Sequence, residues 1–141
     1  MAVETLYNHY ITVNGVDLST KCKSLKVVKN QEVRMISAGG DVVKKHIAGI
    51  GEDRIEAVFF QDRAAGSVLA TLRPLVGVNV AAVNVVAKYK NAAAAATNEQ
   101  YTLSSIISGE VPLINGAWGE VEEVPITFVS ASGSGIAVAT S

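Results

Sequence analysis

The stretch RIEAVFFQDRAAGSVLATLRPL, residues 54–75, decides the fold because its hydrophobic period changes part of the way along. In the first part, Ile55, Ala57 and Phe59 alternate with charged or small residues. Successive side chains of a strand point to opposite faces, so this alternation predicts a strand with one buried face.

The second part of the stretch predicts a helix. Its apolar residues at positions i, i+3, i+4 and i+7 are Ala65, Val68, Leu69 and Leu72, which form one stripe. We expect the helix to start at Asp62, whose carboxylate can accept hydrogen bonds from the first free N–H groups. Pro74 should end it, because the residue before a proline disfavours helical geometry. The expected helix has about twelve residues and lies across one face of a sheet.

The rest of the chain shows strand patterns and turn signals. Asn14-Gly15 separates two short alternating runs and is the strongest hairpin signal, because both residues tolerate positive φ. Further strands are expected near residues 24–29, 32–36, 42–47, 78–90, 100–107 and 124–129. About seven or eight strands at this spacing predict a mainly β fold, a two-sheet β-sandwich or barrel flanked by one α-helix.

A second hairpin is predicted from about residue 33 to residue 50, with Gly39 and Gly40 at its tip. Its first strand is expected to continue the strand at 24–29 after a bulge. Val33 and Met35 are then expected to face inward, because they share one parity along that strand.

Three segments late in the chain are expected to be irregular. The alanine-rich run 91–99 should be a loop, because five alanines are too few for a stable isolated helix. Residues 108–119, rich in glycine, should form a long ordered loop or a weak hairpin. The apolar tail from Ile136 is either a last strand of its own sheet or an arm that pairs with a neighbour.

The length of 141 residues favours a single domain. We expect an N-terminal arm of about residues 1–9 and a C-terminal tail of about residues 131–141. Charged residues make up 18%, below the roughly 25% usual for a soluble domain. Apolar surplus of this kind favours subunit interfaces, and the alternative is a hydrophobic monomer with an alanine-rich surface.

The inventory of residues argues against several function classes. The net charge of −1 gives no overall field that attracts nucleic acid. No apolar run is long enough for a membrane-spanning helix, and the N-terminal residues lack the pattern of a secretion signal. A single cysteine, Cys22, excludes an intrachain disulfide and suits a reducing cytosol.

Candidate chemistry is equally sparse. Two histidines and one cysteine cannot supply a clustered zinc site. The adjacent carboxylates at residues 52–53 and 122–123 would point to opposite faces of a strand. No serine or glycine-rich loop stands in a catalytic context. We therefore expect no catalytic residue, cofactor or metal, and no enzyme.

Interface candidates come from charge and from exposed loops. A basic run near residues 21–29 and an acidic region near residues 110–123 can either be solvated or meet on neighbouring copies, which would fix their register. The candidate interface residues are Lys21, Lys23, Gly39, Gly40, Lys44, Lys45, Glu110, Trp118, Glu120, Glu122, Ile136 and Val138.

Two single residues have competing interpretations. Trp118, the only tryptophan, either plugs one end of the core or anchors an interface, where tryptophan is enriched. Cys22 is expected to be a small buried residue and not a reactive thiol.

Three segments resemble one protein family. ITVNGVDLS (residues 11–19) is similar to the opening strand pair of the major tail, or tail tube, proteins of siphophages. FFQDRAAGSV (residues 59–68), continuing through LRPLVG (residues 72–77), resembles their central strand and helix. VPITFV (residues 124–129) with its small-residue tail resembles their ending, so the similarity covers most of the chain.

The resemblance implies a non-catalytic virion protein that self-assembles into stacked, hexameric rings with a β-lined channel. Double-stranded DNA would pass through without specific binding. The implied partners are further copies and other phage tail proteins (tape measure, terminator and tail tip), with no membrane. The implied location is the phage tail, assembled in the host bacterial cytoplasm.

Two other functions remain open at this point. Capsid-decorating and head–tail joining proteins of phages share the same general look. A monomeric β-barrel that binds a ligand is the more distant alternative, and it would require a concave pocket lined with aromatic residues.

Overall fold

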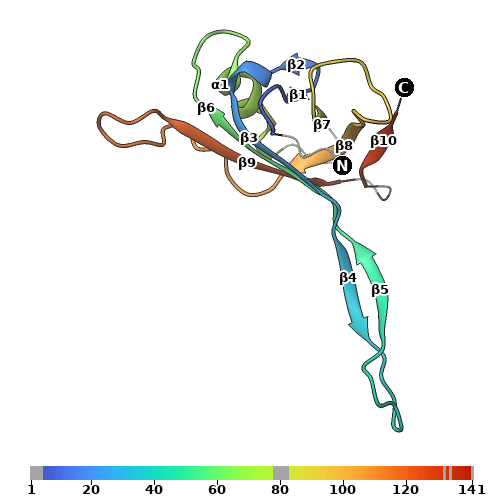
Figure 1. The fold of residues 1–141 in the computed structure, drawn as a ribbon. Coiled ribbons are helices and arrows are strands. Elements are labelled where there is room, and N and C mark those ends of the chain that lie inside the picture. Colours follow the sequence, from blue (N-terminus) through green and yellow to red (C-terminus); the bar gives the residue numbers. More distant parts are fainter. Residues whose placement is uncertain (1–4, 78–82, 132, 134, 141) are drawn as a thin grey trace.

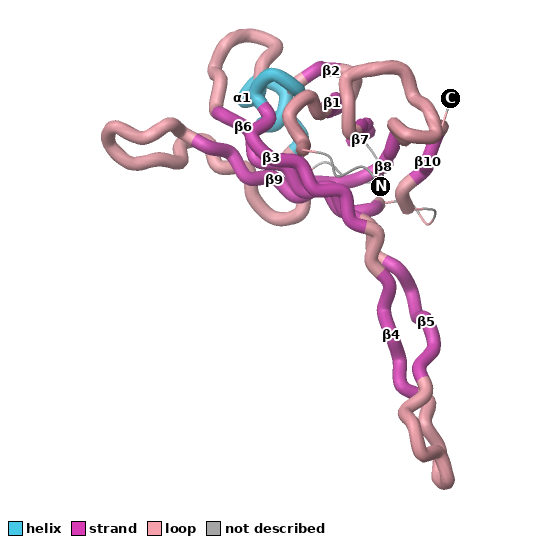
Figure 2. Tube along the Cα trace, in the orientation of Figure 1, coloured by secondary structure: helices cyan, strands magenta, loops and turns pink. Residues whose placement is uncertain are grey.

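The computed structural model describes residues 5–77, 83–131, 133 and 135–140 (Figures 1 and 2). The fold is mainly β with one short helix, as the sequence predicts. The strands are β1 (Tyr10–Val13), β2 (Val16–Asp17), β3 (Cys22–Val28), β4 (Gln31–Met35), β5 (His46–Gly51), β6 (Arg54–Phe60), β7 (Val83–Lys88), β8 (Gln100–Ile107), β9 (Glu123–Ser130) and β10 (Ala137–Ala139).

Eight of these strands form one antiparallel sheet. Seven follow the order β2-β1-β7-β8-β9-β6-β3, and the eighth, β10, pairs with β8. The strand β8 joins its two halves. One end of β8, Ser105–Ile107, pairs with β9, while the other end pairs with β10. Strand β9 therefore leaves β8 after three pairs and continues beside β6, which lets the two halves of the sheet face each other.

The two halves enclose one core, and this gives the β-sandwich that the sequence predicts. Phe59 and Phe128 from one half and Ile11, Val85 and Leu103 from the other are all fully buried. Strands β6 and β7 show the strict alternation of buried and more exposed residues that a sheet with one core face requires.

The hairpin β1–β2 confirms the Asn14-Gly15 prediction. Asn14 has a φ of 50° and Gly15 a φ of 82°, as a two-residue hairpin turn with two positive φ angles requires. The side chain of Asn14 also accepts a hydrogen bond from the backbone N–H of Asn84, at 2.7 Å. The turn is thereby fixed to the end of β7.

The helix is shorter than predicted. Helix α1 spans Val68–Leu72 and is followed by a 3-10 turn, Arg73–Leu75. Asp62 does not cap it; its carboxylate accepts from the N–H of Ala64 and the hydroxyl of Ser67 in the preceding turn. Gly66, with a φ of 74°, interrupts the expected first turns. Of the predicted stripe, Val68 and Leu72 are buried but Ala65 is exposed.

The predicted second hairpin forms, but it leaves the body of the molecule. Strands β4 and β5 make a separate two-stranded sheet that projects away from the eight-stranded sheet (Figure 1). We call this hairpin, residues 31–51, the arm. The prediction that Val33 and Met35 face inward is wrong: they are 63% and 60% exposed, because none of the described residues forms a second layer over the arm.

The remaining segments follow the sequence in part. The alanine-rich run forms a loop, closed by the buried Asn98, whose side-chain amide donates to carbonyls of residues 90, 92 and 93. The tail forms the last strand of its own sheet, β10. The expected strand at 78–90 is seen as β7 from Val83, and its first residues lie outside the described ones.

Candidate assembly surfaces

The arm has two chemically different faces. Val33 pairs with Ala48 and Met35 with His46 across the two strands, so these four residues share one face. Ile50, two residues after Ala48, continues it and is 82% exposed. We call this set, Val33, Met35, His46, Ala48 and Ile50, the apolar face of the arm. It is free of carboxylates and of lysine and arginine.

The opposite face of the arm is more polar. Arg34 pairs with Ile47 across the strands and donates to the carboxylate of Glu32 at 3.1 Å. The side chain of Glu32 lies over Gly49, where an added Cβ would come within 2.9 Å of it. The arm therefore presents a charged face and an apolar face. The charged groups Arg34 and Glu32 bond to each other, whereas the apolar side chains stay exposed to water.

Local hydrogen bonds order the tip of the arm. The carboxylate of Asp41 accepts from the N–H of Ala38 at 2.8 Å and pairs with Lys45 at 3.3 Å. Gly39 and Gly40 lie in this turn, as predicted. Lys44 is exposed. Beside it stand two exposed valines, Val42 at 98% and Val43 at 77%, which the sequence analysis did not single out.

A second projection is the loop between β8 and β9, residues 108–122, which extends beyond the start of β9 (orange to red in Figure 1). We call its outer part, residues 113–122, the Trp118 loop. Trp118 is fully exposed, so the interpretation of this residue as a plug of the core is wrong. Ile114 and Val121, at 84% and 70%, are exposed beside it.

The base of the Trp118 loop is braced against the segment after β6. The guanidinium of Arg63 donates to both carboxylate oxygens of Glu122, at 2.8 and 2.9 Å, and to the carbonyl of Leu113. Glu122 also accepts from the N–H of Asn115. The hydrogen bonds from Arg63 and then from Asn115 lower the pKa of Glu122 below its ordinary value. The tip is thus presented on a fixed base.

Most of the predicted basic and acidic residues meet within the chain itself. Lys23 pairs with Glu123 at 2.5 Å, and Lys21 pairs with Asp62 at 3.3 Å. Glu122 is taken by Arg63. Among the described residues, Lys44, Glu110 and Glu120 form no ion pair and are exposed.

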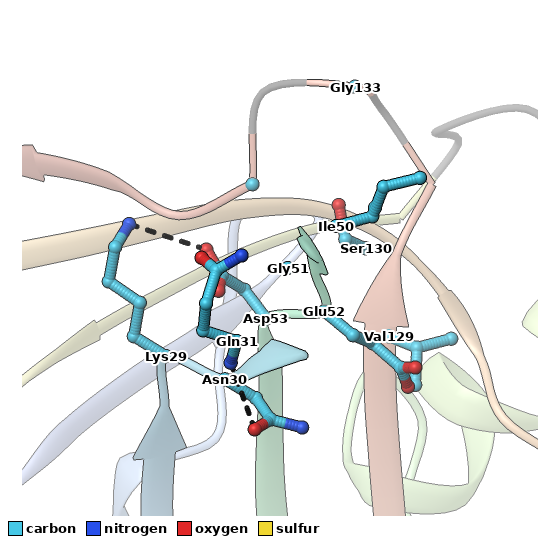
Figure 3. A pocket seen from close by; sticks show the side chains of 11 residues that line it. Lys29, Asn30, Gln31, Ile50, Gly51, Glu52, Asp53, Val129, Ser130 and Gly133 are labelled. Carbon is cyan, nitrogen blue, oxygen red and sulfur yellow. Dashed lines mark hydrogen bonds and ion pairs between the residues drawn. The ribbon is translucent and has the colours of Figure 1, made fainter. Parts of the chain in front are cut away.

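A pocket of about 690 Å³ lies at the base of the arm, between its first residues and the chain after β9 (Figure 3). Asp53, only 7% exposed, lies in it with Lys29 at 3.6 Å. The Asp53 carboxylate also accepts from the N–H of Ile136 at 2.8 Å. These contacts hold the C-terminal segment in place, and they place Ile136 in the chain's own core while Val138 stays 53% exposed.

The described residues offer little for chemistry. They contain no group of three or more histidine, cysteine, aspartate or glutamate side chains that could hold a metal ion. Burial raises the pKa of the Cys22 thiol to about 11, and its Sγ donates to the carbonyl of Ser24. Cys22 is therefore buried, as the sequence predicts, and its raised pKa disfavours the reactive thiolate. None of the described helices is long and apolar enough to cross a membrane.

The class that the fold defines is a β-sandwich with one short helix and two apolar projections. The sequence matches no protein-family model and no curated protein sequence. Its fold is similar to a chain in the virion of a native gene transfer agent particle, with a TM-score of 0.69, 9% identity and 99% of both chains covered. It is also similar to a chain in the tail of an empty gene transfer agent particle, solved with C6 symmetry, at a TM-score of 0.61 and 10% identity. That match covers 91% of this chain and 88% of the other. The chain therefore has a fold that occurs in virion and tail particles.

Proposed function

We propose that the protein is a non-catalytic structural subunit of a phage-type tail, which assembles into stacked rings that form a tail tube. The likeness to a virion chain over nearly the whole of both chains supports this proposal. The second neighbour belongs to a tail with C6 symmetry, which favours six subunits in each ring.

The single observation that carries the proposal is the arm. A two-stranded hairpin is marginally stable on its own in water, and the described part of the chain places no layer on the apolar face of this one. An exposed apolar surface on an otherwise well-packed domain supports an interaction site there. Ring contacts or ring-to-ring contacts would cover it.

The proposed tube also implies what passes through it, which proteins it contacts and where it is located. Double-stranded DNA would pass through the channel without specific binding, since phosphate attraction to a basic lumen would slow it. The other partners would be the tape measure, terminator and tail tip proteins. The subunit would be made in the host cytoplasm and end in the tail of the virion.

Negative-stain electron microscopy and light scattering over a concentration series test the proposal. Rings or hollow tubes are the expected result. A compact trimer would favour a capsid-decorating protein, and a monomer that also stays single in the presence of preformed tail tips would contradict the proposal.

A pair of arm variants sharpens the experiment. Val33→Ser with Met35→Ser changes the apolar face, whereas Arg34→Ser with Ile47→Ser changes the opposite face of the same hairpin. The first pair should prevent rings, and the second should weaken them less. Equal effects of the two pairs would show that the apolar face has no special part in assembly.

A further inference from the structure

The Trp118 loop is the strongest unassigned feature of the described surface. It is the site of the only tryptophan, and that side chain is fully exposed. The proposed function gives the loop no specific contact. An exposed indole on a mobile loop would say little about binding. This loop, however, is held by hydrogen bonds among Arg63, Glu122 and Asn115.

Preorganisation is what makes the loop suited to binding. A turn closes its tip, where the N–H of Glu120 donates to the carbonyl of Ala117 at 3.1 Å. Gln61 adds a hydrogen bond from its side-chain amide to the carbonyl of Leu113. Because the loop is already ordered, docking Trp118 would cost little further conformational entropy.

An apolar pocket of matching size lies elsewhere on the molecule. It has a volume of about 290 Å³ and is formed by β3, β7, β8 and the chain before β1. Its lining residues include Leu6, Leu25, Val27, Ala87, Lys88 and Tyr101. The hydroxyl of Tyr101 is already bonded to Glu99, so this residue offers the pocket mainly its ring. The volume suits one large side chain better than a whole small molecule.

The charges beside the two features have opposite signs. Glu120, two residues from Trp118, is exposed and forms no ion pair with any described residue. Lys88 is one of the residues that line the pocket, and its ammonium group donates to the carbonyl of Ala92 at 2.7 Å and lies 4.4 Å from the centre of the Tyr10 ring. The positive charge of Lys88 at this edge of the pocket favours a partner segment that carries a carboxylate.

The loop and the pocket cannot meet within one chain. The loop is fixed beside Gln61 and Arg63, after the end of β6, whereas the pocket lies against the other half of β3 and against β7 and β8. In Figure 1 the loop projects on the side away from β8 and β10. Trp118 can therefore enter such a pocket only on another molecule.

We infer that Trp118 of one subunit inserts into the pocket lined by Leu25, Val27 and Tyr101 on a second copy of this chain. A contact between two different surfaces of identical subunits is head-to-tail, and it closes into a ring when its rotation closes. This inference rests on the proposed ring assembly and assigns the contact between neighbours within a ring.

Fluorescence of the single tryptophan tests the inference directly, in parallel with microscopy of the same samples. In the free subunit, emission should be that of an indole in water, with full quenching by acrylamide. On assembly, the emission maximum should shift to shorter wavelength and the quenching constant should fall several-fold.

A pocket variant and a matched control complete the test. Leu6 and Val76 are 41% and 47% exposed, so a glutamate at either position should leave the subunit folded, as thermal melting checks. Leu6→Glu should prevent the protection of Trp118, and Val76→Glu should not. A cysteine pair, Trp118→Cys on one chain and Leu6→Cys on another, should form a disulfide on mixing.

The outcomes separate the two proposals. Rings in which Trp118 stays exposed would overturn this inference and leave the proposed function standing. Protection that Leu6→Glu does not disturb, without the mixed disulfide, would overturn the assignment of the pocket. Subunits that never assemble, even with preformed tail tips, and in which Trp118 stays exposed throughout would overturn both.

Discussion

At the scale of single residues, Asp53 and Gly135 hold the C-terminal segment together. Gly135 has a φ of 69°, and an added Cβ would lie 2.4 Å from the Asp53 carboxylate. The backbone must pass this close so that the N–H of Ile136 can donate to that carboxylate. No other residue type suits both the positive φ and the close approach.

Gly135→Ala should therefore lower the free energy of unfolding by about 1–3 kcal/mol, through strain and through the displaced carboxylate. Urea denaturation measures this change. Gly133→Ala is the matched control, because no atom lies within 4 Å of its added Cβ and its φ is not positive. The control should change stability by less than about 0.5 kcal/mol. Equal losses in both variants would contradict the role of Asp53.

Cys22 makes a second prediction at this scale. With a pKa of about 11 and a buried side chain, it should react slowly with Ellman's reagent at pH 8 in the folded protein. In urea, where the protein is unfolded, the Cys22 thiol should react completely and fast with the same reagent. A fast reaction of the native protein would show that the region around Cys22, whose carbonyl lies 2.8 Å from Nε2 of His9, opens readily.

At the scale of elements, the Trp118 loop depends on the charge of Glu122. The folded pKa of this carboxyl lies below its ordinary value, so the unfolded state binds its proton first as the pH falls. The contribution of the pair with Arg63 is thus complete above the ordinary pKa, about 4.3, and is lost as the pH falls through the lower folded value. The loop should loosen in that acidic range.

Fluorescence anisotropy of Trp118 against pH measures this loosening. The anisotropy should be constant at neutral pH and should fall only in the acidic range in which Glu122 gains its proton. In Glu122→Gln it should be low at every pH, because the neutral amide cannot form the charged pair with Arg63. An anisotropy that stays high in that variant would show that other contacts, such as those of Gln61, suffice.

Sequence reasoning succeeded where one local signal decides the structure. Asn14-Gly15 fixes its turn through positive φ, and the alternation around Phe59 fixes a buried face. It failed where burial depends on whether another layer of the structure covers the strand. Val33 and Met35 alternate like core residues, yet no layer of this chain covers them. Likewise, the apolar stripe from Ala65 to Leu72 predicts one continuous helix, but the positive φ of Gly66 interrupts it.

The candidate surfaces show the same division. The turn at Gly39 and Gly40 and the loop at residues 108–119 were expected from their glycines, but their projection from the body was not. The pairing of Lys23 with Glu123 was not expected, because 100 positions separate them and only the sheet brings them together. Val42, Val43 and Ile114 were missed because a sequence pattern does not distinguish an exposed apolar residue from a buried one.

At the scale of the whole molecule, stability should be uneven. The strands of the body share one buried core, whereas the arm has ladder hydrogen bonds open to water on both faces. Hydrogen exchange of the free subunit should thus be slow in β6 and β7 and fast in β4 and β5. On assembly, the amides of the arm should become protected.

This exchange experiment also checks the proposed function at the level of the subunit. Arm amides that are already slow in the free subunit would show that the hairpin is stable by itself and needs no partner. Arm amides that stay fast in assembled tubes would show that assembly uses other surfaces. Phe128→Ala should lower the free energy of unfolding by about 3–5 kcal/mol. Amides whose exchange becomes faster in this variant exchange by unfolding of the whole subunit, and they serve as the reference.

The connection of the arm to the body has a mechanical consequence. Only residues 29–30 separate β3 from β4, and only residues 52–53 separate β5 from β6. A pull on the arm therefore enters the sheet along β3 and β6, with no slack loop to absorb it. Because β6 is bonded to β3 on one edge and β9 on the other, that load is shared by two full ladders in shear. A tail that bends or contracts would strain the body of each subunit before it could detach the arm from it.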